Sequence, residues 1–191
     1  MSHVSIIGSG NMGQAIAGIV TKGGNTVEVL STSDAARPVT GDIVVLAVPY
    51  PAVSDVIAER GDQLAGKVVV DITNPLDFET FDSLTVPADG SAAAEIAAAL
   101  PQSRVLKAFN TTFAGTLVSG SVGPVPTTVL IAGDDADAKS LLAGVVSAGG
   151  LKAVDAGSLR RARELEALGF LQLTLAVGEK VSWTGGFGVV A

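Results

Sequence analysis

Three glycines near the N-terminus have the spacing of a phosphate-binding turn. Gly8, Gly10 and Gly13 follow a short apolar run at Val4–Ile7 and precede a segment, Asn11–Lys22, whose apolar residues recur with a helical period. In such a turn the first glycine permits a tight bend, the second lets a pyrophosphate approach the backbone, and the third lets the helix pack against the strand. The helix N-terminus then directs its N–H groups at the phosphates. The predicted dinucleotide-binding residues of this turn are Gly8, Ser9, Gly10, Asn11, Met12 and Gly13, and a tight turn without a ligand is the alternative.

Further polar or turn residues follow four other predicted strands. These clusters are Ser31–Ser33, Val48–Tyr50, Thr73–Pro75 and Asn110–Thr112. Because ligands of open α/β sheets bind at the carboxyl ends of the strands, the shared position of the clusters predicts one binding cleft at that edge.

The turn after the predicted strand Thr26–Leu30 bears on the choice of dinucleotide. Proteins that bind NAD usually place Asp or Glu there to accept a hydrogen bond from the ribose 2′-hydroxyl. This chain has Ser31-Thr32-Ser33, whose hydroxyl and N–H groups can donate to a 2′-phosphate, and Arg37 can supply positive charge. Asp34 counts against this interpretation unless its side chain points away. The pattern favours NADP(H) over NAD, with a polar turn that binds nothing as the alternative.

Strand-like and helix-like segments alternate along the chain. The predicted strands are residues 4–7, 26–30, 43–48, 67–72, 104–109, 127–132 and 152–155, and the predicted helices are residues 11–22, 52–60, 92–100, 133–148 and 159–177. Alternation of this kind predicts an α/β fold with a doubly wound, mostly parallel sheet of the Rossmann type. The connection from Leu30 to Asp42 is too short for a full crossover helix, so we expect one helical turn there or none.

Composition narrows the classes of partner and chemistry. The 191 residues carry a net charge of −7, which argues against nucleic acid or an anionic membrane as a partner. There is no cysteine and only one histidine, His3, so neither thiolate catalysis nor a multi-histidine metal site is expected. The sequence shows no basic region before its first apolar run and no convincing membrane span. We therefore expect no signal peptide and a cytoplasmic location.

Five later motifs, taken in order with the glycine turn, resemble the family of NADPH-dependent coenzyme F420 (deazaflavin) oxidoreductases. The motifs are Leu46–Tyr50, Asp71–Leu76, Lys107–Thr111, Gly133–Asp135 and Asp155–Glu166. The resemblance covers nearly the whole chain. It implies an NADP-binding Rossmann domain at residues 1–157 and a C-terminal helical segment at residues 158–191. That segment would complete the substrate pocket and contribute a dimer contact.

The resemblance also implies roles for individual residues. Ser9–Met12 would hold the pyrophosphate, and Ser31 and Thr32 would face the 2′-phosphate. The residues expected to line the nicotinamide are Ala47, Val48, Pro49, Tyr50 and Ala108. The residues expected to contact the deazaflavin, or a flavin in its place, are Asn74, Pro75, Leu76 and Asn110.

Direct hydride transfer between two redox rings needs proximity, alignment and exclusion of water rather than a protein acid. We therefore predict no catalytic side chain, with Lys107 packing or snorkelling and Tyr50 covering the nicotinamide. One alternative is an NADP-dependent imine or carbonyl reductase, which would need a proton donor such as Lys107, Tyr50 or Lys180. Another alternative is a non-catalytic NADP(H)-binding redox sensor.

The last predicted helix combines a basic start with a nearly apolar body. Arg160, Arg161 and Arg163 form either an anion site or a solvated face paired with Glu164 and Glu166, and the second interpretation is favoured. The body of the helix carries leucine at several turns, and a helix that is apolar on all sides must be buried. We therefore expect a homodimer that packs these helices together.

Overall fold

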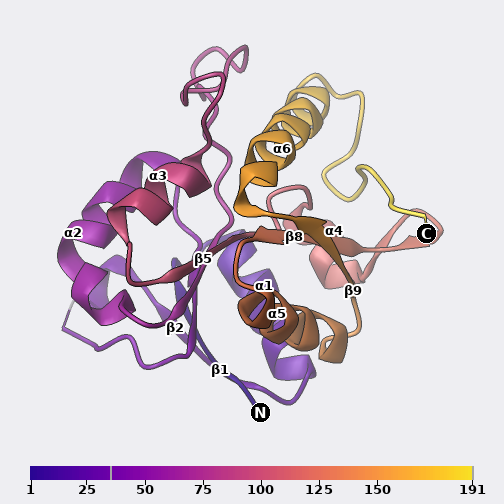
Figure 1. Cartoon of the computed structure of the whole chain (residues 1–191). Coiled ribbons are helices and arrows are strands. Elements are labelled where there is room, and N and C mark those ends of the chain that lie inside the picture. Colours follow the sequence, from indigo (N-terminus) through magenta and orange to yellow (C-terminus); the bar gives the residue numbers. More distant parts are fainter. Residues whose placement is uncertain (35, 191) are drawn as a thin grey trace.

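The protein, represented by a computed structural model, folds around one seven-stranded sheet. The structure describes residues 1–34 and 36–190, without the side chain of Thr32. The strand order is β2-β1-β3-β4-β5-β8-β9 (Figure 1). The strands of this sheet are β1 (His3–Ile7), β2 (Thr26–Leu30), β3 (Ile43–Leu46), β4 (Val68–Asp71), β5 (Arg104–Lys107), β8 (Thr128–Gly133) and β9 (Lys152–Gly157).

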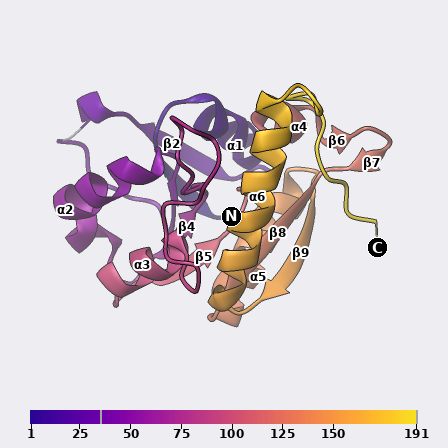
Figure 2. The same cartoon turned by 90° about the horizontal axis from the view of Figure 1, so that it is seen from above.

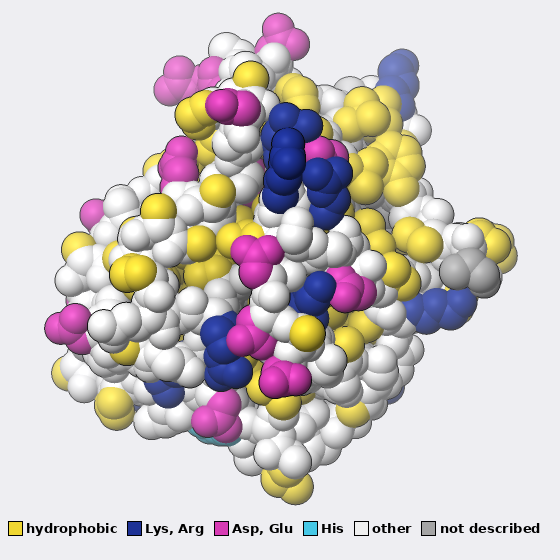
Figure 3. Space-filling view, viewed as in Figure 1, with side chains coloured by type: hydrophobic (Ala, Val, Ile, Leu, Met, Phe, Trp, Pro, Cys, Tyr) yellow, Lys and Arg dark blue, Asp and Glu magenta, His cyan; other side chains and the backbone are white. Residues whose placement is uncertain are grey.

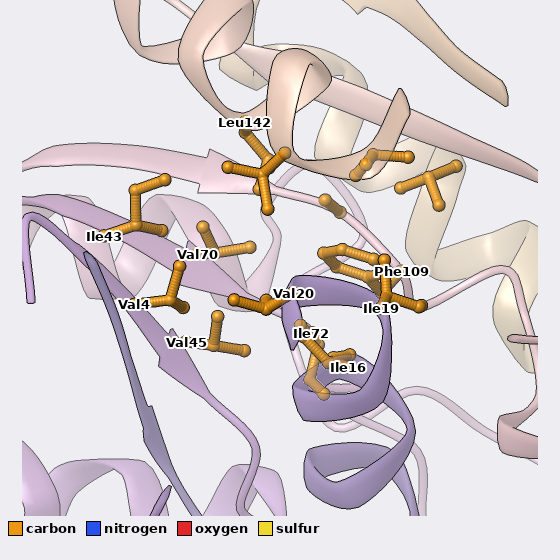
Figure 4. Packing of buried hydrophobic residues seen from close by; sticks show 14 of the residues in the cluster. Val4, Ile16, Ile19, Val20, Ile43, Val45, Val70, Ile72, Phe109 and Leu142 are labelled. Atoms are coloured by element: carbon orange, nitrogen blue, oxygen red, sulfur yellow. The ribbon is translucent and has the colours of Figure 1, made fainter. Parts of the chain in front are cut away.

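Helices cover both faces of the sheet. They are α1 (Asn11–Lys22), α2 (Val53–Leu64), α3 (Ala92–Ala99), α4 (Ala114–Ser119), α5 (Ala136–Ala148) and α6 (Ala162–Val177). On one face, side chains of α1 and α5 such as Ile16 and Leu142 pack on Val45 and Val70 of the sheet (Figure 4). On the other face, α2 and α3 form a second core with the alternate side chains of the same strands. Apolar residues on both faces explain why the central strands read as uninterrupted hydrophobic runs.

Two helices begin directly after capping side chains. The Ser91 hydroxyl accepts a hydrogen bond from the Ala94 N–H at 3.1 Å, and the Asp135 carboxylate accepts one from the Ala138 N–H at 2.7 Å. These bonds satisfy N–H groups that have no partner inside the helix, so α3 and α5 start where local chemistry favours it.

Helix α6 lies above the sheet, over β8 in both views (Figures 1 and 2), and its Gly169 meets Asn74 and Asn110, which follow β4 and β5. The residues from 178 to 190 follow it as a chain without helix or strand, as expected for this glycine-rich stretch. Among the described residues, no helix has the length and apolar character required to cross a membrane.

The predicted alternation of strands and helices is confirmed, with differences in detail that include the bounds of several elements, such as α2, which extends to Leu64. Strand β8 pairs antiparallel with β5, whereas the other pairings in the sheet are parallel. The stretch between β5 and β8, for which no regular element is predicted above, contains α4 and a small hairpin of β6 (Ser121–Val122) and β7 (Val125–Pro126). Strand β5 ends before Phe109, because that residue has a φ of +63°, which no strand accommodates. The short connection after Leu30 carries only a 3₁₀ turn, Thr32–Asp34, in its described part, as expected.

Candidate functional site

The glycine turn is held between two neighbouring strands. The Gly8 N–H donates to the Leu30 carbonyl of β2 at 2.8 Å, and the Ala47 N–H, just after β3, donates to the Ile7 carbonyl at 2.8 Å. Gly8 has a φ of +121°, and a Cβ there would lie 2.1 Å from the Ala47 carbonyl oxygen. The turn therefore requires glycine at this position.

The second and third glycines serve different purposes. A Cβ at Gly13 would lie 2.1 Å from the Gly8 carbonyl oxygen, so α1 can approach the turn only because this side chain is missing. A Cβ at Gly10 would meet no described atom within 4 Å. Packing therefore explains Gly8 and Gly13 but leaves Gly10 unexplained. The open space in front of its backbone, at the N-terminus of α1, fits the phosphates of a dinucleotide.

Two adjoining hollows open beside this turn. One of about 320 Å³ is lined by Gly10, Asn11, Met12, Ala47, Val48, Pro49, Tyr50, Ile72, Thr73, Asn74, Phe78 and Leu173. The other, of about 430 Å³, is lined by Asn11, Met12, Ile72, Asn74, Asn110, Thr112, Phe113, Ala114, Gly115, Leu173, Trp183 and Thr184. Five residues line both: Asn11, Met12, Ile72, Asn74 and Leu173. The structure thus brings the glycine turn and three of the four predicted strand-end clusters around one region, as expected from the sheet edge, whereas Ser31 and Ser33 line neither hollow.

Several predicted site residues lie elsewhere. Ala108 is fully buried in the core, and Pro75 and Leu76 are buried as well, so their side chains line neither hollow. Their binding roles remain predictions, and these residues would have to contribute through backbone atoms or through packing. Ser31 and Ser33 follow β2, whose last residue, Leu30, accepts the Gly8 N–H, and Arg37 contacts the carboxylates of Asp34 and Glu28. The Thr32 side chain lies outside what the structure describes.

Two asparagines connect the strand ends to α6. The Asn74 amide donates to the Asn110 carbonyl at 3.0 Å, and the Asn110 amide donates to the Leu165 carbonyl of α6 at 2.8 Å. A Cβ at Gly169 would lie 2.3 Å from Oδ1 of Asn74, so α6 crosses this pair at its glycine. Oδ1 of Asn110 and Oγ1 of Thr73 are buried and have no hydrogen-bond partner among the described residues. Unsatisfied polar atoms at the edge of a hollow suit a ligand with polar groups.

A buried ionic network lies beneath the hollows. The Lys107 ammonium contacts the Asp71 carboxylate at 2.8 Å and the Glu166 carboxylate at 2.9 Å, and it donates to the Thr73 carbonyl at 2.6 Å. All three charged side chains are shielded from solvent. The expectation that Lys107 packs or snorkels is therefore wrong, because its ammonium is the centre of a buried ion cluster instead of reaching water.

Glu166 also departs from expectation. It was expected on a solvated face of the last helix, but its Oε2 accepts the Ala92 N–H at 2.9 Å, at the start of α3. Burial raises the pKa of the Glu166 carboxyl, and the neighbouring Lys107 ammonium opposes that rise. Glu166 therefore links α6, α3 and β5 through charge.

Tyr50 is the one titratable side chain among the residues that line the two hollows. Its hydroxyl donates to the Glu95 carboxylate of α3. Burial, followed by this bond, raises the Tyr50 pKa above its ordinary value of 10.0. A phenol with a raised pKa is a weaker acid than an ordinary tyrosine, which fits a covering role better than proton donation.

The basic residues at the start of α6 lie partly exposed. Arg161 and Arg163 contact the Glu164 carboxylate at 3.5 Å and 3.1 Å. Figure 3 shows basic side chains gathered over α6, with hydrophobic side chains beside them toward the C-terminal tail. These pairs agree with the favoured interpretation of a solvated face for Glu164, although Glu166 is not part of it.

Sequence reasoning missed several lining residues. Thr73 and Thr112 belong to strand-end clusters that it did identify, so position alone could have included them. Leu173 and Trp183 come from the C-terminal segment, and Trp183 packs on Phe113 with ring centroids 5.0 Å apart. No local pattern indicates that these side chains return to the glycine turn.

Comparisons with known proteins agree with this geometry. Residues 23–75 match the family model described as NADP oxidoreductase, coenzyme F420-dependent. The F420-dependent NADP reductase of Methanocaldococcus jannaschii is 32% identical over 160 residues, covering 82% of this chain and 70% of the relative. The enzyme of the same name from Methanothermobacter thermautotrophicus is 34% identical over 166 residues, covering 84% of this chain and 70% of the relative. A solved structure of a putative F420-dependent NADP reductase from Arthrobacter sp. FB24 superposes over the full length of both chains with a TM-score of 0.85 at 23% identity, which shows a shared fold.

Proposed function

The chain belongs to the family of the F420-dependent NADP reductases, and on this premise we propose that it transfers a hydride between NADP(H) and coenzyme F420. The observation that supports this most directly is the pair of adjoining hollows at the glycine turn, which share five lining residues. Two redox rings that must meet face to face need two neighbouring spaces, one of them beside the dinucleotide loop.

The proposed dinucleotide site takes its groups from several parts of the chain. The backbone of Ser9–Met12, at the start of α1, would hold the pyrophosphate, because Gly10 leaves its approach open. Ser31-Thr32-Ser33 and Arg37 would hold the 2′-phosphate at the end of β2. The segment Ala47–Tyr50 would line the nicotinamide, since its four residues face the smaller hollow, and Ala108 would support it from the core.

The acceptor ring would lie against Asn74, Pro75, Leu76 and Asn110. We propose that residues 1–157 form the NADP-binding domain and that residues 158–191 complete the acceptor pocket. Leu173 and Trp183 of the second segment support this division, because they line the hollows beside residues of the first. Side chains such as Met12 and Leu173 would keep water away from the reacting carbons.

The chemistry divides between the bound groups and the chain. When bound, the nicotinamide and the deazaflavin supply the carbon that gives the hydride and the carbon that takes it. The chain then needs only to bind, align and exclude water. Because burial and the hydrogen bond to Glu95 raise its pKa, Tyr50 is a weaker proton donor than an ordinary tyrosine, and we assign it a covering role.

Isotope transfer tests the proposal. NADPH carrying deuterium at the transferred position of the nicotinamide is mixed with the protein and oxidised coenzyme F420, and the product is examined by mass spectrometry. We expect one deuterium in the reduced deazaflavin, because hydride transferred directly from carbon to carbon does not exchange with water. Deuterium found in solvent instead would contradict direct transfer.

Parallel reactions separate the alternatives. FMN, FAD and pyrroline-5-carboxylate replace coenzyme F420 at equal concentration. Turnover with the imine alone would identify an imine reductase and refute the proposal. Binding of NADPH without turnover of any acceptor would identify a redox sensor and refute it too. Preference for FMN or FAD would keep the hydride transfer and correct the acceptor.

We further propose a homodimer formed through α6 in the cytoplasm, where the pool of NADP(H) is available. Leu171 and Val177 of α6 are 49% and 45% exposed, and Trp183 of the following tail is 53% exposed. Apolar side chains gathered on one helix and its tail are typical of a contact surface. Light scattering on the purified protein tests this, and a monomeric mass at micromolar concentration would refute it.

A further inference from the structure

The Asp34 side chain folds back onto the end of β2. Its Oδ2 accepts hydrogen bonds from the Ser31 N–H at 2.8 Å and from the Ser31 hydroxyl at 2.7 Å. Its Oδ1 accepts one from the Arg37 guanidinium at 3.2 Å. Ser31 and Arg37 are the groups that the sequence predicts for a 2′-phosphate. An anion of the chain itself therefore already occupies donors that the cofactor's anion would need.

The backbone around Asp34 is anchored from α2. Arg60 has a side chain that is 4% exposed, and it donates to the Asp34 carbonyl at 2.7 Å and to the Arg37 carbonyl at 2.8 Å. These bonds hold the main chain of the turn in place. The carboxylate can thus leave Ser31 by rotation of its own side chain, while the turn as a whole stays where it is.

The Arg37 guanidinium is already paired with acidic side chains in this arrangement. Besides Asp34, it lies 3.8 Å from the Glu28 carboxylate of β2. Two carboxylates therefore share one guanidinium. A 2′-phosphate that entered beside them would meet like charge, unless Asp34 moved away.

We propose that Asp34 determines the dinucleotide selectivity of this site as an internal competitor of the 2′-phosphate. A 2′-phosphate binds only after the carboxylate has left Ser31 and Arg37, whereas a 2′-hydroxyl can bind without displacing it and can donate to it. Asp34 therefore weakens NADPH and leaves NADH nearly unaffected. This inference rests on the proposed function only in that the glycine turn must bind a dinucleotide.

The ionisation of Asp34 supports the same view. Hydrogen bonds from the Ser31 side chain and backbone, and then from Arg37, lower the Asp34 pKa from its ordinary value of 3.8 to about 2. The competing group is therefore charged at every pH suitable for a binding measurement.

The variant Asp34→Asn removes the charge and keeps the size of the side chain. We expect it to bind NADPH about tenfold more tightly, equivalent to about 1.4 kcal/mol, as for the removal of one nearby like charge. Binding of NADH should change less than about threefold, because a 2′-hydroxyl carries no charge. Isothermal titration calorimetry of each dinucleotide measures both, and 2′,5′-ADP against 5′-AMP repeats the comparison without the nicotinamide.

A matched control tests whether any similar carboxylate has the same effect. Asp155 on the opposite edge strand β9 also accepts a backbone N–H, from Gly157 at 2.8 Å, and contacts a cation, Lys139, at 2.8 Å. Asp155→Asn should leave both affinities unchanged. Asp34→Ser, which is smaller and also uncharged, provides a second variant, and circular dichroism verifies that each variant is folded.

The outcomes distinguish this inference from the proposed function. Tighter binding of NADPH alone supports the inference. Equal changes for NADPH and NADH, or weaker NADPH binding in both variants, overturn it and leave the proposed hydride transfer intact. If the wild-type protein binds neither dinucleotide, the proposed function fails, and the inference fails with it.

Discussion

Replacement of Lys107 by methionine should strongly destabilise the protein. In the native structure one ammonium lies between two carboxylates, Asp71 at 2.8 Å and Glu166 at 2.9 Å, and all three side chains are shielded from solvent. Lys107→Met preserves the length of the side chain but leaves two buried negative charges next to each other. Removing one partner of a buried ion pair typically costs about 3–5 kcal/mol. For a chain of this size, that corresponds to a fall in melting temperature of roughly 6–20 °C.

Urea denaturation followed by circular dichroism measures the loss, and Lys139→Met is the matched control. Lys139 contacts Asp155 at the same 2.8 Å, but that carboxylate is 60% exposed. An exposed pair contributes about 1 kcal/mol or less, so the control should lose little. A loss in Lys107→Met no greater than in the control would refute the reasoning that burial decides the cost.

A second substitution and a pH series test the cause. In Lys107→Met, the further change Glu166→Gln removes one of the two excess charges and should restore part of the stability, by more than about 1 kcal/mol of coupling. The Glu166 pKa is already raised by burial above 4.5, and loss of Lys107 raises it further. A carboxyl with a raised folded-state pKa costs stability as the pH rises through that window. The deficit of Lys107→Met should therefore be smaller at pH 5 than at pH 8.

Three shorter predictions concern the hollows. Gly10→Ala should keep its free energy of unfolding within about 1 kcal/mol of the wild type, because no described atom opposes the new Cβ. It should nevertheless bind NADPH roughly 5- to 150-fold more weakly, because the Cβ would clash with the pyrophosphate. Calorimetry compares it with Gly18→Ala, whose Cβ is equally free, and equal NADPH binding by the two variants would contradict the prediction. Gly169→Ala should raise the KM for the acceptor, because its Cβ would lie 2.3 Å from Asn74 Oδ1 and must displace α6. Steady-state kinetics at a fixed saturating NADPH concentration measure this KM. An unchanged KM would count against a role of α6 in the acceptor pocket. Tyr50→Phe should leave the shape of the pH profile of kcat unchanged, since the raised pKa keeps the hydroxyl protonated, and loss of a titrating limb would instead reveal a proton-transfer role.

Much of the architecture could be predicted because it follows from local chemistry. The glycine turn at Gly8–Gly13 bends at the residue where a side chain would collide with Ala47, and α1 begins and ends where expected. Ser91 and Asp135 cap the helices that follow them. The polar clusters after β1, β3 and β4 gather at one edge, because parallel strands place their carboxyl ends together. Each of these features depends on a few consecutive residues and the period of the apolar ones.

Other features arise only when distant segments meet. The sequence places Lys107 in a strand but does not show which way its side chain points. Its ammonium contacts Glu166, which lies far along the chain on α6. The direction of β8 depends on its pairing with β5, and no local signal encodes it. Trp183 closes the larger hollow because the C-terminal tail folds back onto Phe113.

The glycine turn, the order of strands and helices and the edge that carries the site were thus determined by the sequence itself, since backbone geometry and apolar period act over short distances. The tertiary structure alone decided which charges are buried together, where Asp34 directs its carboxylate and how α6 covers the strand ends. These depend on competition among partners brought together by the fold, and short-range patterns carry no information about which partner prevails.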